Sequence, residues 1–135
     1  MKDCIICKII NEEVRSYKVF EDEDTLAFLD IYPSAPGHTI VSLKKHGLTI
    51  LDYSQEELGK LWLTVQKVDS ALIKAFDTKL ITIGINQFEE GGVPHLHVHL
   101  IPRWKNDGGG IIQTTVKNPP KESLEKIKEK ISSAF

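Results

Sequence analysis

The chain has 135 residues, of which 41% are hydrophobic and 27% charged, and its formal net charge at pH 7 is −2. These values are ordinary for a globular protein, and the length fits a single domain over residues 1–135. The sequence has no basic stripe that would suggest nucleic acid binding, and the apolar runs fall short of the about 20 residues of a membrane span. The two cysteines form no disulfide framework, and the first residues lack the long apolar region of a signal peptide. We therefore expect a cytoplasmic protein.

Apolar spacing divides the chain into segments of helical and of extended period. The clearest helix start is the capping box that runs from Ser54 to Glu57. Together the segments predict an α+β fold, with a five-stranded antiparallel sheet, a long helix, a short N-terminal helix and a C-terminal helix. In chain order we predict a helix over 4–14, strands over 17–20, 25–29 and 38–43, a helix over 54–76, strands over 80–86 and 95–102, and a last helix opened by Pro119 and Pro120, with loops over 31–37, 88–93 and 105–110.

Three of the five histidines occupy alternate positions in the segment His95-Leu96-His97-Val98-His99. This alternation predicts a half-buried strand that carries the three imidazoles on one face and the aliphatic residues in the core. The Cα atoms of His95 and His99 would lie about 13 Å apart, which disfavours the alternative of a metal protein that uses the histidine row itself. A polar cleft that handles protons or phosphates explains the row better than a plain solvent-exposed face, which gives no reason for three histidines.

The run from His95 to Ile101 resembles the signature of the histidine triad (HIT) superfamily, His-φ-His-φ-His-φ-φ with φ apolar. The resemblance covers most of the chain and implies a small α+β domain, usually a homodimer, that binds nucleotides and hydrolyses or transfers nucleotidyl groups. Expected substrates are nucleoside 5′-phosphoramidates or dinucleoside polyphosphates, and the Ile101-Pro102-Arg103 tail favours the polyphosphate-cleaving branch slightly. Segments that fit the family in the same order are Cys4–Ile10, Phe28–Asp30, Ala35–His38, Lys44–His46 and Val93–Pro94.

The resemblance also assigns roles to the histidines. His97 is expected to attack the α-phosphorus and form a covalent nucleotidyl-histidine, while its other ring nitrogen donates to a backbone carbonyl. His99 is expected to hold the phosphoryl oxygens, and His38 and His95 to complete the cluster. The alternative for His38 is a histidine that only closes the preceding Pro-Gly turn. This chemistry requires no cofactor.

A nucleotide-binding surface is implied as well. Asp30 is expected to accept hydrogen bonds from the ribose hydroxyls, and Asn86 to lie near the phosphates. The alternatives are a turn-capping aspartate and an ordinary amide at the end of a strand. Each residue expected around the base would serve equally well in the core; these residues are Ile6, Ile9, Val14 and Phe28.

The segment before the triad departs from the family. Many members have a Gly-Gln pair and a hydroxyl residue there, whereas this chain has Glu89-Glu90-Gly91-Gly92. The backbone N–H groups of Gly91 and Gly92 are the remaining donors for a phosphate. This departure motivates an alternative function, a nucleotide-binding or interaction module with little or no catalysis.

Cys4-x-x-Cys7 has the spacing of a metal chelate, and Cys2His2 is a tetrahedral zinc arrangement. The resemblance to some bacterial members implies that His46 and His95 complete the site, and that zinc would be structural, joining the N-terminal helix to the sheet. Two cysteines packed as small hydrophobic residues are the alternative. Trp62 is a candidate for the homodimer interface or for the core.

Overall fold

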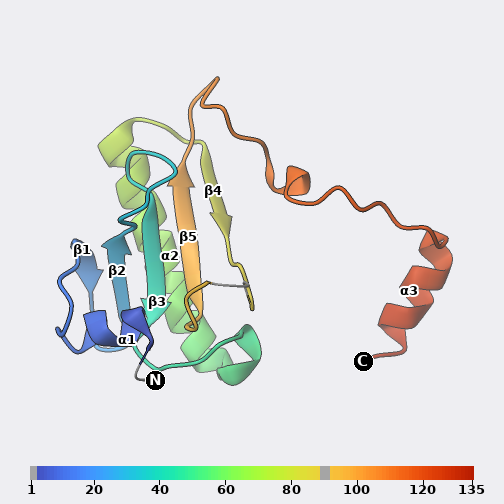
Figure 1. Ribbon diagram of the computed structural model, residues 1–135, viewed down its shortest axis with the longest axis horizontal. Helices are drawn as coiled ribbons and strands as arrows, with labels where there is room; N and C mark the ends of the chain where they lie inside the picture. The colour runs from blue at the N-terminus through green and yellow to red at the C-terminus, as the bar shows by residue number, and fades with distance from the viewer. Residues whose placement is uncertain (1–2, 89–91) are drawn as a thin grey trace.

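An antiparallel sheet of five strands organises the described part of the chain, residues 3–88 and 92–135 of the computed structural model. The elements are α1 (Ile5–Ile10), β1 (Lys18–Glu21), β2 (Thr25–Leu29), β3 (Thr39–Leu43), α2 (Gln55–Phe76), β4 (Ile81–Gly84), β5 (His97–Pro102) and α3 (Leu124–Ser132), with 3₁₀ turns at Ile50–Asp52 and Ile112–Thr114. The strand order is β1-β2-β3-β5-β4. Figure 1 shows α2 along one face of this sheet and α1 in front of the other. The predicted α+β architecture is confirmed.

Each face of the sheet has its own core, because alternate residues of a strand point to opposite faces. On one side Ala27 and Val41 pack against α2, whose buried residues Leu61, Val65, Val68 and Leu72 recur at helical spacing. On the other side Phe28 and Ile40 pack against Ile6 and Ile9 of α1. The helix α2 begins at the predicted capping box, where the Ser54 hydroxyl accepts from the Glu57 backbone N–H.

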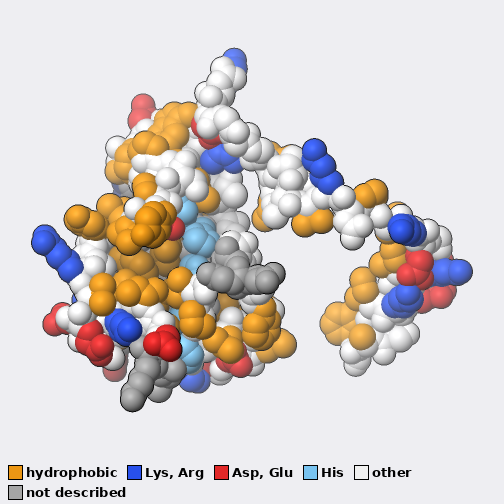
Figure 2. Space-filling model, in the orientation of Figure 1, with side chains coloured by type: hydrophobic (Ala, Val, Ile, Leu, Met, Phe, Trp, Pro, Cys, Tyr) orange, Lys and Arg blue, Asp and Glu red, His pale blue; other side chains and the backbone are white. Residues whose placement is uncertain are grey.

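Strand register decides which face carries the histidines. Ile40 of β3 is paired with His99 of β5, and cross-strand partners point to the same face. His99 and His97 therefore lie on the α1 side, and Figure 2 shows the histidine side chains in one line down this face. The intervening Val98 and Leu100 are fully buried in the α2 core, as the alternation predicted.

Several predicted boundaries were wrong because local contacts override the apolar period. The first helix ends at Ile10 rather than at Val14, since Glu12 adopts the left-handed φ of 61°. The strand predicted from His95 begins at His97, because the His95 N–H turns back to the Val93 carbonyl at 2.8 Å. The last helix begins four residues after the proline pair, at Leu124. There the Ser123 hydroxyl accepts from a backbone N–H of the first turn.

Residues after β5 leave the sheet as an extended arm that ends in α3, well apart from the strands (Figure 1). Apolar side chains of the arm remain exposed, among them Leu124, Ile131 and Phe135. Of the helices in the described residues, none has the length and apolarity needed to cross a bilayer.

Candidate active site and metal centre

Three imidazoles form a contiguous cluster where β3 and β5 run side by side. The ring centroids of His97 and His99 are 4.8 Å apart, and those of His38 and His99 are 5.1 Å apart. His97 and His99 come from alternate positions of β5, whereas His38 immediately precedes β3. The structure thus brings together three of the four histidines expected in the catalytic cluster.

The orientation of the His97 ring follows from one short hydrogen bond. Nδ1 of His97 lies 2.6 Å from the carbonyl oxygen of His95. A carbonyl can only accept, so Nδ1 carries the proton, and Nε2 of the neutral ring holds the lone pair. The prediction that one ring nitrogen contacts a backbone carbonyl is therefore confirmed. The ring is buried, with 5% of the residue exposed.

A second chain of hydrogen bonds orients His99. The backbone N–H of Ser34 donates to Nδ1 of His38 at 3.0 Å, so the neutral His38 ring carries its proton on Nε2. That Nε2 lies 2.9 Å from Nδ1 of His99 and donates to it. The neutral His99 ring therefore carries its own proton on Nε2. Burial lowers the pKa of His38, against the opposing charge of Asp30, and this shift favours the neutral form.

Asp30 caps a turn, as the alternative for this residue predicted, and it also lies beside the histidine cluster. Its Oδ1 accepts from the Tyr32 backbone N–H at 2.9 Å, which caps the turn after β2. Its Oδ2 lies 3.6 Å from Nε2 of His38. A cavity of about 440 Å³ beside it is lined by Leu29, Asp30 and the loop 33–38. One carboxylate oxygen therefore fixes the loop while the other faces the histidines.

The apolar residues expected around the base lie in the α1 core. Ile6, Ile9 and Phe28 are at most 6% exposed, and Val14 packs against them. These four side chains therefore pack as core residues, which was the alternative to a role around the base. Asn86, by contrast, lines a cavity of about 580 Å³ together with His99. The divergent stretch Glu89–Gly91 lies outside the described residues.

Cys4, Cys7, His46 and His95 form a second cluster, in which one ligand atom from each lies within 4.8 Å of the others. Sγ of Cys7 lies 3.3 Å from Nδ1 of His46, and Sγ of Cys4 lies 3.4 Å from Nδ1 of His95. Nε2 of His95 donates to the Leu43 carbonyl at 2.8 Å, which leaves the lone pair of the neutral ring on Nδ1, toward the sulfurs. Two sulfurs and two imidazole nitrogens are a donor set that suits zinc.

The surroundings of this cluster favour the neutral forms of His95 and Cys7. Burial lowers the pKa of His95 to about 4, and burial with the neighbouring Cys4 raises the pKa of the Cys7 thiol to about 11. A bound cation would replace the thiol protons, because thiolates are the form that ligates metal. The donor set therefore fits a structural zinc ion, with Cys4 and Cys7 at the start of α1, His46 after β3 and His95 before β5.

His95 connects the two clusters. Its ring faces the cysteines, while its backbone carbonyl holds Nδ1 of His97. The row of three predicted from the sequence is thus divided between two sites. Backbone partners such as the Ser34 N–H and the Leu43 carbonyl leave no signal in the sequence, so sequence reasoning missed them.

A five-stranded antiparallel sheet backed by one long helix, with a histidine row on its other face, defines the class of HIT-fold proteins. The family model of the HIT domain matches residues 11–106 of this chain. This chain belongs to the HIT family.

Relatives support the assignment along nearly the whole chain. An uncharacterized HIT-like protein of Borreliella burgdorferi is 39% identical over 98% of both chains. An adenosine 5′-monophosphoramidase of Saccharomyces cerevisiae is 30% identical over 95% of this chain and 80% of its own. The crystal structure of a HIT family member from Bacillus subtilis superposes with a TM-score of 0.84 at 34% identity, covering 98% of this chain and 97% of that one.

Proposed function

We propose that this chain is a nucleotide hydrolase or transferase that cleaves the α-phosphate linkage of nucleoside phosphoramidates or dinucleoside polyphosphates. The observation that carries the proposal is the 2.6 Å contact between Nδ1 of His97 and the His95 carbonyl. It leaves the lone pair on Nε2 of a ring that lies beside His99, so the nucleophile needs no separate base.

The reaction proceeds in two balanced steps. Nε2 of His97 forms a bond to the α-phosphorus, the bond from phosphorus to the leaving group breaks, and the leaving group departs with the electron pair and a proton from solvent. Water then attacks the nucleotidyl-His97 phosphorus, the P–N bond breaks, and the nucleoside monophosphate and one proton are released. The Nε2–H of His99 donates to the phosphoryl oxygens in both steps, and Asp30 accepts from the ribose hydroxyls.

Two assays test this proposal. Rapid mixing with adenosine 5′-phosphoramidate or a diadenosine polyphosphate, followed by intact-mass measurement, is expected to show one covalently added AMP group. His97→Ala is expected to abolish turnover and the adduct while AMP still binds, and Lys105→Ala, an exposed change in the arm, serves as the matched control. Hydrolysis at the wild-type rate by His97→Ala removes His97 as nucleophile. Binding without any product favours a binding module instead.

We also propose that Cys4, Cys7, His46 and His95 hold a structural zinc ion. When bound, the ion would join α1 to the sheet by coordinate bonds. Metal analysis of Cys4→Ser and His97→Ala separates this site from the triad: loss of zinc in Cys4→Ser alone supports it. Loss in His97→Ala alone assigns the metal to the histidine row.

A homodimer is proposed from two features, an uncovered edge strand and exposed apolar side chains on α2. The edge strand β4 has hydrogen-bonding groups on its outer side that no described strand covers. Trp62 and Leu63 of α2 are 49% and 58% exposed, so Trp62 does not belong to the core of its own chain. We expect light scattering to give the mass of two chains, and Trp62→Ser to shift it toward one.

A further inference from the structure

Two cysteine side chains share the first turn of α1, outside the histidine cluster of the proposed reaction. Cys4 is the N-cap of this helix, and its Sγ accepts from the backbone N–H of Cys7 at 3.4 Å. The Sγ atoms of the two cysteines lie within 4.8 Å of each other. Residues three apart on a helical turn are neighbours. An S–S bond can therefore close by side-chain rotation within this one turn, without movement of the sheet.

The two thiols differ in their access to solvent. Cys4 is 1% exposed, whereas Cys7 is only partly buried. Cys7 also lines a cavity of about 440 Å³, whose polar lining includes Lys8 and Lys44. A small polar molecule that enters this cavity therefore meets the sulfur of Cys7 first, and the sulfur of Cys4 lies behind it.

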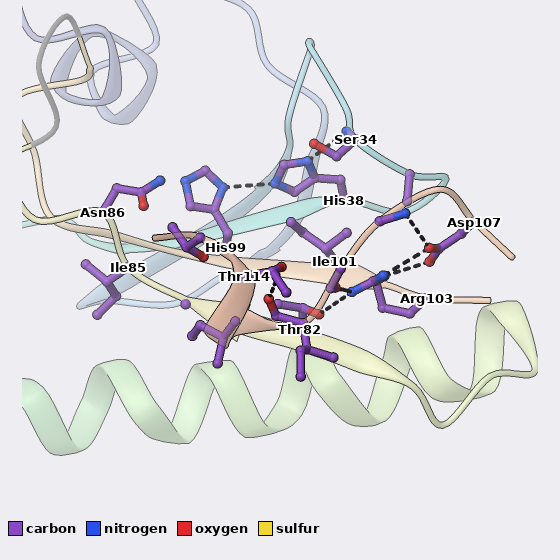
Figure 3. A pocket seen from close by; sticks show the side chains of 17 residues that line it. Ser34, His38, Thr82, Ile85, Asn86, His99, Ile101, Arg103, Asp107 and Thr114 are labelled. Carbon is purple, nitrogen blue, oxygen red and sulfur yellow. Dashed lines mark hydrogen bonds and ion pairs between the residues drawn. The ribbon is translucent and has the colours of Figure 1, made fainter. Parts of the chain in front are cut away.

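The cavity at Cys7 is separate from the proposed nucleotide site. Figure 3 shows the larger cavity, where the rings of His38 and His99 lie near Asn86. Among the described residues, none that lines this larger cavity, or the one beside Asp30, also lines the cavity at Cys7. A reaction at Cys7 therefore need not compete with nucleotide binding.

The two histidines of the Cys2His2 cluster are held by other parts of the chain. Nε2 of His95 donates to the Leu43 carbonyl at 2.8 Å. The loop that carries His46 is fixed by the Tyr53 hydroxyl, which donates to the carbonyl of the preceding Lys45 at 3.0 Å. These contacts do not involve the sulfurs, so loss of the sulfur donors would leave two imidazoles in place. Structural zinc sites use four ligands, so the remaining pair would hold the ion weakly.

We propose that Cys4 and Cys7 are a redox modification site, which a hydroperoxide converts to a reversible intramolecular disulfide, and that this disulfide releases the zinc ion. The release rests on the proposed zinc site, whereas formation of the disulfide does not. In a reducing compartment such disulfides are transient and serve catalysis or redox sensing. The same two sulfurs would therefore bind zinc under reducing conditions and give it up when hydroperoxide is present.

The oxidation by hydrogen peroxide proceeds in two balanced steps. Thiolate is the reactive form of cysteine, and ligation to a metal keeps sulfur in that form. The Cys7 sulfur attacks one peroxide oxygen, the O–O bond breaks, and hydroxide leaves and takes a proton from solvent, so that Cys7 becomes a sulfenic acid. The Cys4 sulfur then attacks the Cys7 sulfur, the S–S bond forms, the S–O bond breaks, and a second hydroxide leaves and takes a proton. The sulfurs together lose two electrons, and the peroxide is reduced to two molecules of water.

Intact-mass measurement of the zinc-loaded protein tests this site. After treatment with a small excess of hydrogen peroxide, we expect each chain to lose the mass of two hydrogen atoms. A chromogenic chelator is expected to detect one released zinc ion per disulfide, and dithiothreitol with added zinc to restore the starting state. Addition of oxygen without a disulfide, a disulfide between two chains, or a disulfide that leaves zinc bound overturns the proposal.

Single serine variants test which sulfur reacts first. In Cys4→Ser the partly buried Cys7 remains, and it is expected to gain one oxygen atom. In Cys7→Ser the buried Cys4 remains, and its oxidation is expected to be about tenfold slower, because susceptibility follows exposure. Equal rates in the two variants refute attack through the cavity.

A variant that keeps all four zinc ligands tests the same access path. Asn11 is exposed and lines the cavity, so Asn11→Trp is expected to slow disulfide formation several-fold. The exposed control Glu23→Trp, between β1 and β2, is expected to leave the rate unchanged. An unchanged rate in Asn11→Trp counts against the path. If the wild-type protein binds no zinc, the zinc proposal fails, and the mass change alone decides the disulfide.

Discussion

Gly37 connects backbone strain with the placement of a site histidine. It adopts a left-handed φ of 82° immediately before His38. A Cβ atom on Gly37 would overlap the ring of Phe76 and lie 2.8 Å from its Cζ atom. We therefore expect Gly37→Ala to destabilise the fold and to displace His38.

The magnitude follows from two separate costs. A left-handed conformation costs an L-residue about 1 to 2 kcal/mol, and overpacking costs about 1 to 3 kcal/mol. The free energy of unfolding is therefore expected to fall by about 2 to 5 kcal/mol in Gly37→Ala. Gly59 in α2 is the matched control, because a Cβ atom there meets nothing within 4 Å. Alanine is the better helix former, so Gly59→Ala is expected to add about 1 kcal/mol.

Urea denaturation of both variants measures these opposite signs. The double variant Gly37→Ala/Phe76→Ala, compared with Phe76→Ala alone, isolates the backbone strain from the ring overlap. The reasoning is refuted if Gly37→Ala lowers the free energy of unfolding by less than about 1 kcal/mol. It is equally refuted if Gly59→Ala is the more destabilising change.

Three further predictions concern the pKa of His38, the pKa of Asp107 and the cap of α2. Burial lowers the pKa of His38 below its ordinary 6.5 while Asp30 opposes the shift. An NMR titration is therefore expected to give a midpoint below 6.5, lower still in Asp30→Asn, and a midpoint above 6.5 contradicts this. The Arg103 guanidinium holds the pKa of the Asp107 carboxyl well below its usual range. A carboxyl group whose pKa is lower in the folded than in the unfolded protein stabilises the fold above the unfolded pKa of about 3.9. This stabilisation is lost as the pH falls through the folded pKa. The stability difference between wild type and Asp107→Asn is thus expected to stay constant down to about pH 5 and to shrink only below about pH 4; shrinkage near neutral pH rules this out. Ser54→Ala removes the cap of α2 and is expected to cost about 1 kcal/mol in thermal or urea unfolding; an unchanged stability shows that the cap contributes nothing.

Elements with strong local signals could be predicted from the sequence. The capping box at Ser54 and the helical spacing after it place α2 correctly, because both act within a few residues of chain. The alternation through Val98 and Leu100 places the histidines on one face, because a strand has only two faces. The family motifs add the candidate roles of His97 and Asp30.

Features that depend on tertiary contacts could not be predicted in this way. The end of α1 is set by the left-handed Glu12, and the start of α3 by the Ser123 cap. The sequence analysis placed Arg103 in the tail after the predicted strand and predicted a loop over 105–110. The spacing of four between Arg103 and Asp107, next to a run of glycines, is the signal by which the sequence could have indicated their ion pair. The division of the histidine row depends on the hydrogen bond from the His95 N–H to the Val93 carbonyl, and the sequence does not indicate this backbone contact.

The double role of His95 has a consequence for mutagenesis. A peptide carbonyl survives every side-chain replacement, so alanine at this position deletes the imidazole near the sulfurs but preserves the acceptor for Nδ1 of His97. This peptide unit therefore links the position of the His95 ring beside the sulfurs to the orientation of the His97 ring.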